Sequence, residues 1–211
     1  MLGARTAAWA KSGGQYGGLC FTAESANSSV QLTAVGTPPA VTLVKSFDGI
    51  NWEAYAVGEV IELPSIGKYV YLAAGEGGNE TFGSSSFNYH KFVINGLMAS
   101  SGDITSLRRF DLIQTPFATY CYYSMFSGCA GLTSAPELPA TTLANYCYHS
   151  MFHSCTHLAL IKVHFTAWRR TQTSNWVVNV SSAGTFYKPS ALPENFGFGT
   201  IPPDWTVVNI D

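Results

Sequence analysis

The chain has 211 residues, and its 11 Lys and Arg against 13 Asp and Glu leave a net charge of −2, with only 11% charged residues. This low charge argues against a nucleic-acid-binding protein, and 46% apolar residues exclude an intrinsically disordered chain. No stretch of the sequence reaches the roughly 18 apolar residues that a membrane-spanning helix needs.

Residues 1–18 are rich in Gly and Ala, and we interpret them as a flexible or docking arm. The segment has one Arg and lacks the apolar core of a secretory signal peptide. We therefore expect either a protein released by cell lysis, as phage proteins are, or a secreted protein whose signal peptide has been replaced.

Residues 19–98 are predicted to form a small β-domain, an immunoglobulin-like or similar sandwich. Short runs with alternating or β-branched residues follow one another about every ten residues, as in such sandwiches. The runs are 19–23, 29–35, 41–46, 51–57, 59–64, 68–74 and 87–96. Asp48-Gly49 lies between two of these runs and predicts a type I′ hairpin turn.

Residues 99–165 contain an internal repeat. FATYCYYSMFSGCAGL (117–132) and LANYCYHSMFHSCTHL (143–158) align without gaps at an offset of 26 residues, and nine of sixteen positions are identical. A period of this length is typical of leucine-rich-repeat coils, which stack because one coil cannot bury its own apolar face. We expect the aromatic-rich tail, residues 166–211, to cap the stack.

The spacing of apolar residues in each unit predicts a helical face turned into the coil. Cys121, Met125 and Cys129 follow one another at i, i+4 and i+8, a spacing that places side chains on one side of a helix. Stacking the two units in register gives columns of identical residues. The expected core columns are Cys121 with Cys147, Met125 with Met151, Phe126 with Phe152, Cys129 with Cys155, and Leu132 with Leu158.

The five cysteines are interpreted as small buried hydrophobes. Their odd number prevents a complete set of disulfides, and no Cys-x-x-Cys pair indicates zinc. A Cys121–Cys147 disulfide stays open as an alternative, because stacked coils lie about 5 Å apart. His149, His153 and His157 have a ligand-like spacing, but they lie on the opposite side of the expected helix from the cysteines. We therefore expect surface histidines, no metal and no cofactor.

Aromatic and histidine side chains are the candidate binding groups. The sequence lacks GxSxG, HExxH, GxxxxGK[ST] and GxGxxG, so we expect no catalytic residues and no enzyme. Aromatic rings beside Ser, Thr and Asn suit sugars and protein partners. The candidate partner-binding residues are Tyr122, Tyr123, Tyr148, His149, His153, Trp168 and Trp176.

The repeat resembles the BspA-like leucine-rich-repeat surface proteins of gut Bacteroidales and their phages. CYYSMFSGCAGLTSAPELPATTLANYCYHSMFHSCTHL is similar to their unit NCYxxMFxGCxSLTxAPxLPATTLA, and the resemblance continues through the tail at 161–168, 174–193 and 201–207. Relatives often carry many units, whereas this chain has barely two. The resemblance implies adhesion and surface display rather than catalysis.

The sequence thus predicts an α+β fold, with a small immunoglobulin-like β-sandwich followed by a short capped leucine-rich-repeat solenoid. We expect a non-enzymatic surface-display or adhesion protein and favour a phage virion component, such as a head or tail fibre, a decoration protein or a receptor-binding protein. The arm would contact other virion or surface proteins, and the repeat would contact a host-surface glycan or protein, in the virion or outside the cell. The alternatives are a secreted or cell-surface BspA-like bacterial adhesin and a carbohydrate-active enzyme, and a homo-oligomer such as a trimer stays open.

Overall fold

The computed structural model describes residues 18–108 and 117–211, so the expected arm lies outside the described residues except for Gly18. The first half of the chain forms β1 (Leu19–Ala23), β2 (Ser28–Val35), β3 (Leu43–Ser46), β4 (Glu53–Tyr55), β5 (Val60–Leu63), β6 (Tyr69–Ala74), β7 (Gly83–Ser85), β8 (Asn88–Asn95) and β9 (Met98–Ser101). The second half forms η1 (Ile104–Leu107), β10 (Leu132–Ser134), β11 (Leu160–Lys162), α2 (Arg170–Thr173), β12 (Thr185–Lys188) and β13 (Thr206–Asn209).

The predicted α+β fold is wrong, because the described residues are nearly all strand, turn and loop. Their helical content is limited to η1 and α2, each four residues long. A leucine-rich-repeat solenoid with a helix in each coil is therefore not what the chain forms. Consecutive turns replace the helix that we expected through 121–132 and its equivalent in the second unit.

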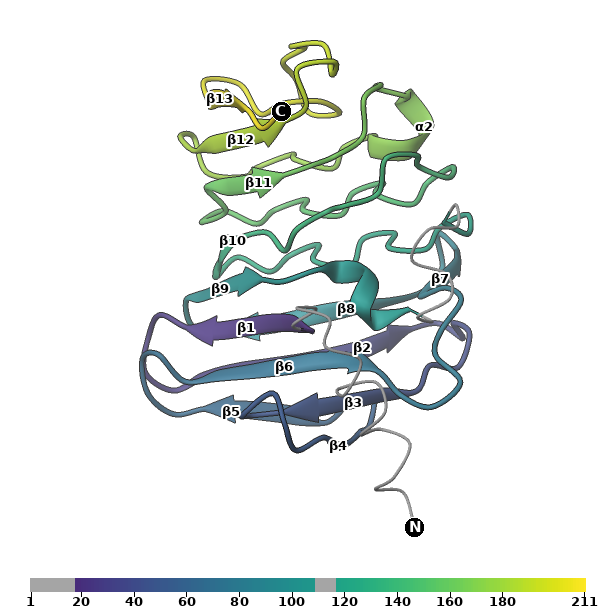
Figure 1. Ribbon diagram of the computed structural model, residues 1–211, viewed down its shortest axis with the longest axis vertical. Coiled ribbons are helices and arrows are strands. Elements are labelled where there is room, and N and C mark those ends of the chain that lie inside the picture. Colours follow the sequence, from purple (N-terminus) through teal and green to yellow (C-terminus); the bar gives the residue numbers. More distant parts are fainter. Residues whose placement is uncertain (1–17, 109–116) are drawn as a thin grey trace.

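Two β-sheets face each other at one end of the molecule (Figure 1). The smaller sheet has the order β5-β2-β8-β7, and its strands are antiparallel. Antiparallel strands in the order β9-β1-β6-β3-β4 belong to the larger sheet. Phe21 on β1 meets Phe92 on β8 with 4.9 Å between ring centroids, so the core of this end lies between the two sheets.

The hairpin of β3 and β4 forms, but the predicted two-residue type I′ turn is wrong. A longer loop separates Ser46 from Glu53. The carboxylate of Asp48 closes this loop, because its Oδ1 accepts the backbone N–H groups of Asn51 (2.7 Å) and Ile50 (2.8 Å). These hydrogen bonds hold the pKa of the Asp48 carboxyl below its ordinary value.

The larger sheet continues from this end into the C-terminal half of the chain. β9 pairs antiparallel with β1 and parallel with β10, and β10, β11, β12 and β13 follow as parallel neighbours. The sheet therefore crosses the expected domain boundary at 98/99. One buried apolar cluster runs from Leu19 to Trp205, so the two halves share a core.

Residues 117–131 and 143–157 form two successive chains of turns, which we call the turn ladder. Left-handed backbone angles recur every four residues in it, with φ of 62° at Tyr120, 52° at Ser124 and 82° at Gly128. The second unit repeats the pattern at its equivalent positions. The period of four residues is therefore the period of a turn and not of a helix.

Backbone hydrogen bonds alternate along the turn ladder between local and interlayer partners. The N–H of Tyr123 donates to the carbonyl of Tyr120 within the same turn, at 3.1 Å. The N–H of Tyr122 instead donates to the carbonyl of Cys147 in the next layer, also at 3.1 Å. This alternation pairs the backbone donors without a helix and fastens each layer to the next.

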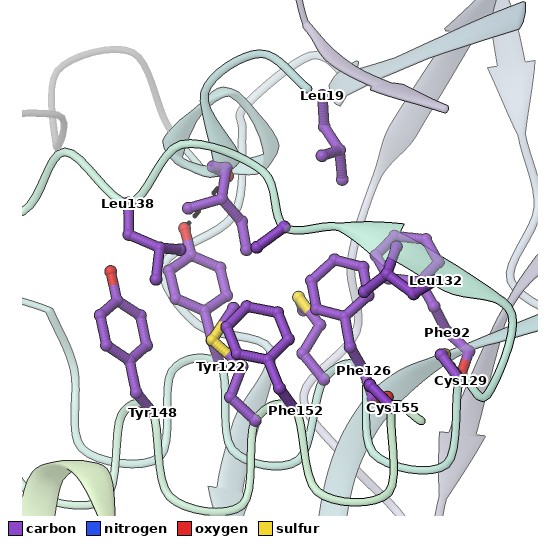
Figure 2. Packing of buried hydrophobic residues seen from close by; sticks show 14 of the residues in the cluster. Leu19, Phe92, Tyr122, Phe126, Cys129, Leu132, Leu138, Tyr148, Phe152 and Cys155 are labelled. Atoms are coloured by element: carbon purple, nitrogen blue, oxygen red, sulfur yellow. Dashed lines mark hydrogen bonds between the residues drawn. The ribbon is translucent and has the colours of Figure 1, made fainter. Parts of the chain in front are cut away.

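The first two turns of each unit direct two consecutive side chains into the core, and the third turn directs its cysteine there. The residues expected to form the core columns, listed above for both units, are 0% or 1% exposed. Phe92, Phe126 and Phe152 lie above one another, with ring centroids 5.2 and 5.6 Å apart (Figure 2). Stacking of identical residues therefore begins on β8 of the sandwich and continues through both units.

All five cysteines are free and buried, so the Cys121–Cys147 disulfide does not form. Burial raises the pKa of the Cys121 thiol to about 11 and that of Cys129 to about 12. Such thiols stay protonated at neutral pH and are poor nucleophiles. The Cys155 thiol donates to the carbonyl oxygen of Phe126 at 3.0 Å, as expected of a packing residue.

Residues 166–211 add further layers to the same stack. β12 and β13 extend the parallel ladder, and indole N–H groups join successive layers. Trp176 Nε1 donates to the carbonyl of Thr200, and Trp205 Nε1 donates to the carbonyl of Ser181, at 2.7 and 2.8 Å. The aromatic residues of the tail thus tie the last layers together.

Candidate binding surface

Five partly exposed rings gather beside the turn ladder, and we call them the tyrosine face: Tyr89, Tyr120, Tyr123, Tyr146 and His149. Tyr120 stacks on Tyr146 with centroids 4.8 Å apart and an interplanar angle of 10°. Tyr123 stacks on His149 at 5.1 Å and 18°. Tyr89 meets the Tyr123 ring edge-on at 5.1 Å, and the Tyr120 and Tyr123 centroids lie 5.5 Å apart, so the five rings form one connected surface.

The layered backbone places these rings together. Tyr120 and Tyr146 occupy equivalent positions of the two units, as do Tyr123 and His149, so in-register stacking puts each pair in contact. Tyr89 comes from β8, which lies against the first unit because the N–H of Phe92 donates to the carbonyl of Met125 at 2.7 Å. The tyrosine face therefore spans three consecutive layers.

The tyrosine face is electrically neutral near pH 7. Burial lowers the pKa of the His149 imidazole from its ordinary value of 6.5, which keeps the ring uncharged. Burial also raises the pKa of the Tyr89 hydroxyl. Lys91 is a nearby cation, and its Nζ donates to the carbonyl of Ser127 at 3.3 Å.

The stacking geometry determines what the tyrosine face can offer to a ligand. Within each stacked pair, the two rings cover one face of each other. Ring edges, phenolic hydroxyl groups and the second face of each ring are then the groups that the stacked partner does not cover. Such a surface can donate and accept hydrogen bonds and can bury apolar edges against a flat partner.

Three of the predicted partner-binding residues are core residues instead. Tyr122, Tyr148 and Trp176 are each 0% exposed, so they cannot contact a partner. A helix would have turned the tyrosines away from the cysteine side, but each turn sends both residues of the Cys-Tyr pair inward. The Tyr122 hydroxyl donates to the carbonyl of Ile104 at 3.3 Å inside the core (Figure 2).

The structure places the other predicted residues in two different settings. Tyr123 and His149 belong to the tyrosine face. His153, on the same turn chain as His149, is partly exposed, and its Nδ1 lies 2.9 Å from Ser154 Oγ. Trp168 packs against Phe165 with centroids 5.3 Å apart. Sequence reasoning placed Trp168 with the tyrosines, whereas it belongs to the aromatic cluster of the tail.

The structure adds Tyr89, Tyr120 and Tyr146, which sequence reasoning missed. Tyr120 and Tyr146 are identical residues at equivalent positions of the repeat, and this identity alone predicts that they stack. Tyr89 has no such signal, because it precedes the repeat and reaches it only through the pairing of β8 with the first unit.

We expect Tyr148→Phe to leave the fold as stable as the wild type or slightly more stable, and Tyr122→Phe to destabilise it by about 1 kcal/mol. The Tyr148 hydroxyl is buried and has no hydrogen-bond partner, whereas the equivalent Tyr122 hydroxyl donates to Ile104. Removing an unpaired hydroxyl relieves a desolvation cost, while removing a paired one loses a buried hydrogen bond. Urea denaturation measures the free energy of unfolding of both variants. Equal losses of stability in the two variants would contradict the difference in hydrogen bonding between the two hydroxyl groups.

Two carboxylates, those of Asp103 and Glu137, lie in adjacent layers of the stack. Asp103 and Glu137 occupy paired backbone positions. Glu137 Oε1 contacts Lys162 Nζ at 2.7 Å and His164 Nε2 at 2.9 Å, and the hydrogen bond from Lys162 lowers the pKa of Glu137. Burial raises the pKa of Asp103, whose Oδ1 accepts the N–H of Thr105 at 2.6 Å. Both carboxylates thus bind neighbouring side chains or backbone, and we assign neither of them to catalysis.

No protein-family model, curated protein or solved structure matches the chain. Across residues 18–108 and 117–211, no helix has the length and apolar character required to cross a membrane. The same residues contain no group of three or more His, Cys, Asp or Glu side chains placed to hold a metal ion.

Proposed function

We propose that the chain is a non-enzymatic surface-display or adhesion protein, and specifically a phage virion component that binds a protein on the host surface through the tyrosine face. The observation that carries the proposal is the continuous surface of five uncharged rings across three layers. The resemblance of the repeat to BspA-like surface proteins supports the same class of function.

A protein partner suits the tyrosine face better than a glycan does. Tyr is enriched in protein interfaces, where a rigid ring offers a large contact area and a hydroxyl at low cost in conformational entropy. Each stacked ring in the tyrosine face has one side covered by its neighbour, so its other side and its edges are left for contact. A flat partner that covers several of these rings at once buries more apolar surface than a single sugar stacked on one ring.

The test is binding of the purified full chain, carrying a fluorescent label, to intact cells of a panel of gut Bacteroidales strains. We expect Tyr123→Ala and Tyr146→Ala each to weaken binding to a responding strain by at least about tenfold, which corresponds to 1.4 kcal/mol. Each substitution removes one partner of a stacked pair and about half of the local aromatic surface.

Phe87→Ala is the matched control, because Phe87 is 78% exposed but is not part of the tyrosine face. The control should bind as the wild type does. Treatment of the cells with proteinase K should abolish binding, whereas periodate oxidation of their glycans should not. Loss of binding only after periodate would replace the protein partner by a glycan, and full binding by both tyrosine variants would overturn the role of the face.

The proposed location has a separate test. Mass spectrometry of purified phage particles from a lysate of the strain that encodes the chain should detect its peptides at a constant ratio to the other virion proteins. Peptides found instead on intact, uninfected cells after surface biotinylation would support the bacterial adhesin over the virion component.

A further inference from the structure

The loop between β3 and β4 borders a pocket of about 290 Å³, which we call the loop pocket. β4 is an edge strand of the larger sheet, and Figure 1 shows it at the opposite end of the molecule from the C-terminal layers. The residues that line the loop pocket are Lys45, Ser46, Phe47, Asp48, Asn51, Trp52 and Glu53. They come from one continuous segment of the chain and include none of the tyrosine face, so the loop pocket is a separate site.

The loop is held in one conformation by its own polar side chains. Ser46 Oγ accepts the N–H of Gly49 at 2.9 Å and donates to Asp48 Oδ1 at 3.0 Å. Asp48 Oδ2 accepts a hydrogen bond from Asn51 Nδ2 at 2.6 Å, in addition to the two backbone N–H groups that Oδ1 accepts. A loop fixed in this way loses little conformational entropy when a ligand binds.

Two aromatic side chains give the loop pocket apolar walls. Phe47 is 49% exposed and lies between Ser46 and Asp48, which are both fixed by hydrogen bonds. The Trp52 indole is partly buried and reaches the start of β1, where a Cβ on Gly18 would lie 3.3 Å from its Cη2. Aromatic rings beside polar groups suit a ligand that has both an apolar face and hydroxyl groups.

The charges of the loop pocket select against ionic ligands. Lys45 contributes one positive charge to the lining, against the negative charges of Asp48 and Glu53. The ammonium group of Lys45 contacts the carboxylate of Glu53 at 3.4 Å and also contacts that of Glu59. An anionic ligand would meet the net negative charge of the lining, and a cationic ligand would meet the ammonium group. A neutral ligand meets neither repulsion.

Glu53 and Asn51 are the groups that can bind a neutral ligand. The Glu53 side chain is 63% exposed and contacts Lys45 through Oε1, so its carboxylate has room for further hydrogen bonds. The hydrogen bond from Asn51 to Asp48 orients the Asn51 amide and fixes the place of its carbonyl oxygen. Asp48 already accepts hydrogen bonds at both oxygens. The loop pocket therefore offers one carboxylate to a ligand, and not the pair that glycoside hydrolysis uses.

We propose that the loop pocket binds one neutral pyranose ring of a glycan. The apolar face of the sugar packs against Phe47 and Trp52, and neighbouring hydroxyl groups of the sugar donate to the Glu53 carboxylate. The volume is at the lower end of the range of about 300–1,000 Å³ for small-molecule sites, which suits a single sugar residue. One weak site of this kind does not hold a chain on a cell, so it adds to the protein contact of the tyrosine face and does not replace it.

The experiment is a calorimetric titration of the full chain with the methyl glycosides of glucose, galactose, mannose and fucose, and with N-acetylneuraminate as the anionic comparison. We expect at least one neutral probe to bind with a Kd on the order of 1 mM, and N-acetylneuraminate not to bind. Phe47→Ala should weaken binding of that probe by at least about tenfold, because the sugar loses its apolar wall. Glu53→Gln should weaken it by about fivefold, because the amide has one acceptor oxygen and no charge.

Ile50→Ala is the matched control, because Ile50 lies in the same loop and is 76% exposed but does not line the loop pocket. This variant should bind the probe as the wild type does. Tyr123→Ala should do so too, which separates the loop pocket from the tyrosine face. Circular dichroism spectra that match the wild type show that the variants fold. The inference would be overturned if no neutral probe bound at about ten times the expected Kd, if only N-acetylneuraminate bound, or if Phe47→Ala bound as the wild type does.

Discussion

Met151→Asp should prevent the stacked layers from folding at 25 °C. Met151 is 0% exposed and belongs to the column that Met125 begins. An aspartate there would bury a carboxylate without a partner, which costs several kcal/mol, out of a total stability of about 5–15 kcal/mol for an ordinary domain. Turns close the layer on one side and strands close it on the other, and Met151 has no exposed surface, so the charge would have no contact with solvent.

Thermal denaturation followed by circular dichroism measures this effect. Met151→Leu conserves volume and should cost less than about 1.5 kcal/mol. His153→Asp, two residues away at a partly exposed position, should melt close to the wild type. If Met151→Asp melted as His153→Asp does, residue 151 would not be in the core, and the inward assignment of the turn ladder would be wrong.

The strands of the sandwich could be predicted from sequence because the runs alternate or are rich in β-branched residues and end at turn-forming segments. β8 follows this rule along its length, with a buried residue at every second position from His90 to Ile94. β9 was missed because Met98–Ser101 is short and half polar, and it is a strand only because β1 and β10 pair with it. Such pairing partners are remote in sequence and leave no local pattern.

The turn ladder was taken for a helix because both structures repeat at an interval near four residues. Cys121, Met125 and Cys129 fit an i, i+4, i+8 stripe in either case. What distinguishes the turn is that the next residue, as in Cys121-Tyr122, is also apolar and that Ser124 and Gly128 follow at the left-handed positions. Pairs of apolar residues at a strict period of four, with serine or glycine directly before the next pair, are the signal that indicates the turns.

The candidate binding surface could be predicted only in part for the same reason. Placing Tyr123 and His149 outside needed only the repeat, since both lie opposite the core residues in a helix and in a turn. Placing Tyr122 needed the backbone itself, because a helix would put it at the edge of the buried face, about 100° around from Cys121, whereas the turn sends it into the core. Stacking between equivalent positions, as in Tyr120 and Tyr146, follows from the repeat in either backbone.

Gly131→Ala should disrupt the junction between the sandwich and the first layer. A Cβ on Gly131 would lie 1.9 Å from the carbonyl oxygen of Gly96, and the obstacle is backbone, which no rotamer change can move aside. The carbonyl of Gly131 also accepts the N–H of Met98 at 2.9 Å, at the start of β9. The added methyl group would therefore push β10 away from β9, where the sheet passes from one half of the chain to the other.

Overpacking costs about 1–3 kcal/mol and occasionally more, and we expect the upper end here because the clash is with backbone. For a chain of this size that loss lowers the melting temperature by about 6–12 °C. Gly199→Ala is the matched control, because its Cβ would meet its nearest neighbour at an ordinary 3.5 Å. Its melting temperature should change little.

The second unit carries His157 where the first has Gly131, so the repeat itself tolerates a side chain there. The glycine is thus required by the hairpin of the sandwich at Gly96, and an unchanged melting temperature for Gly131→Ala would mean that the first layer does not rest on that hairpin.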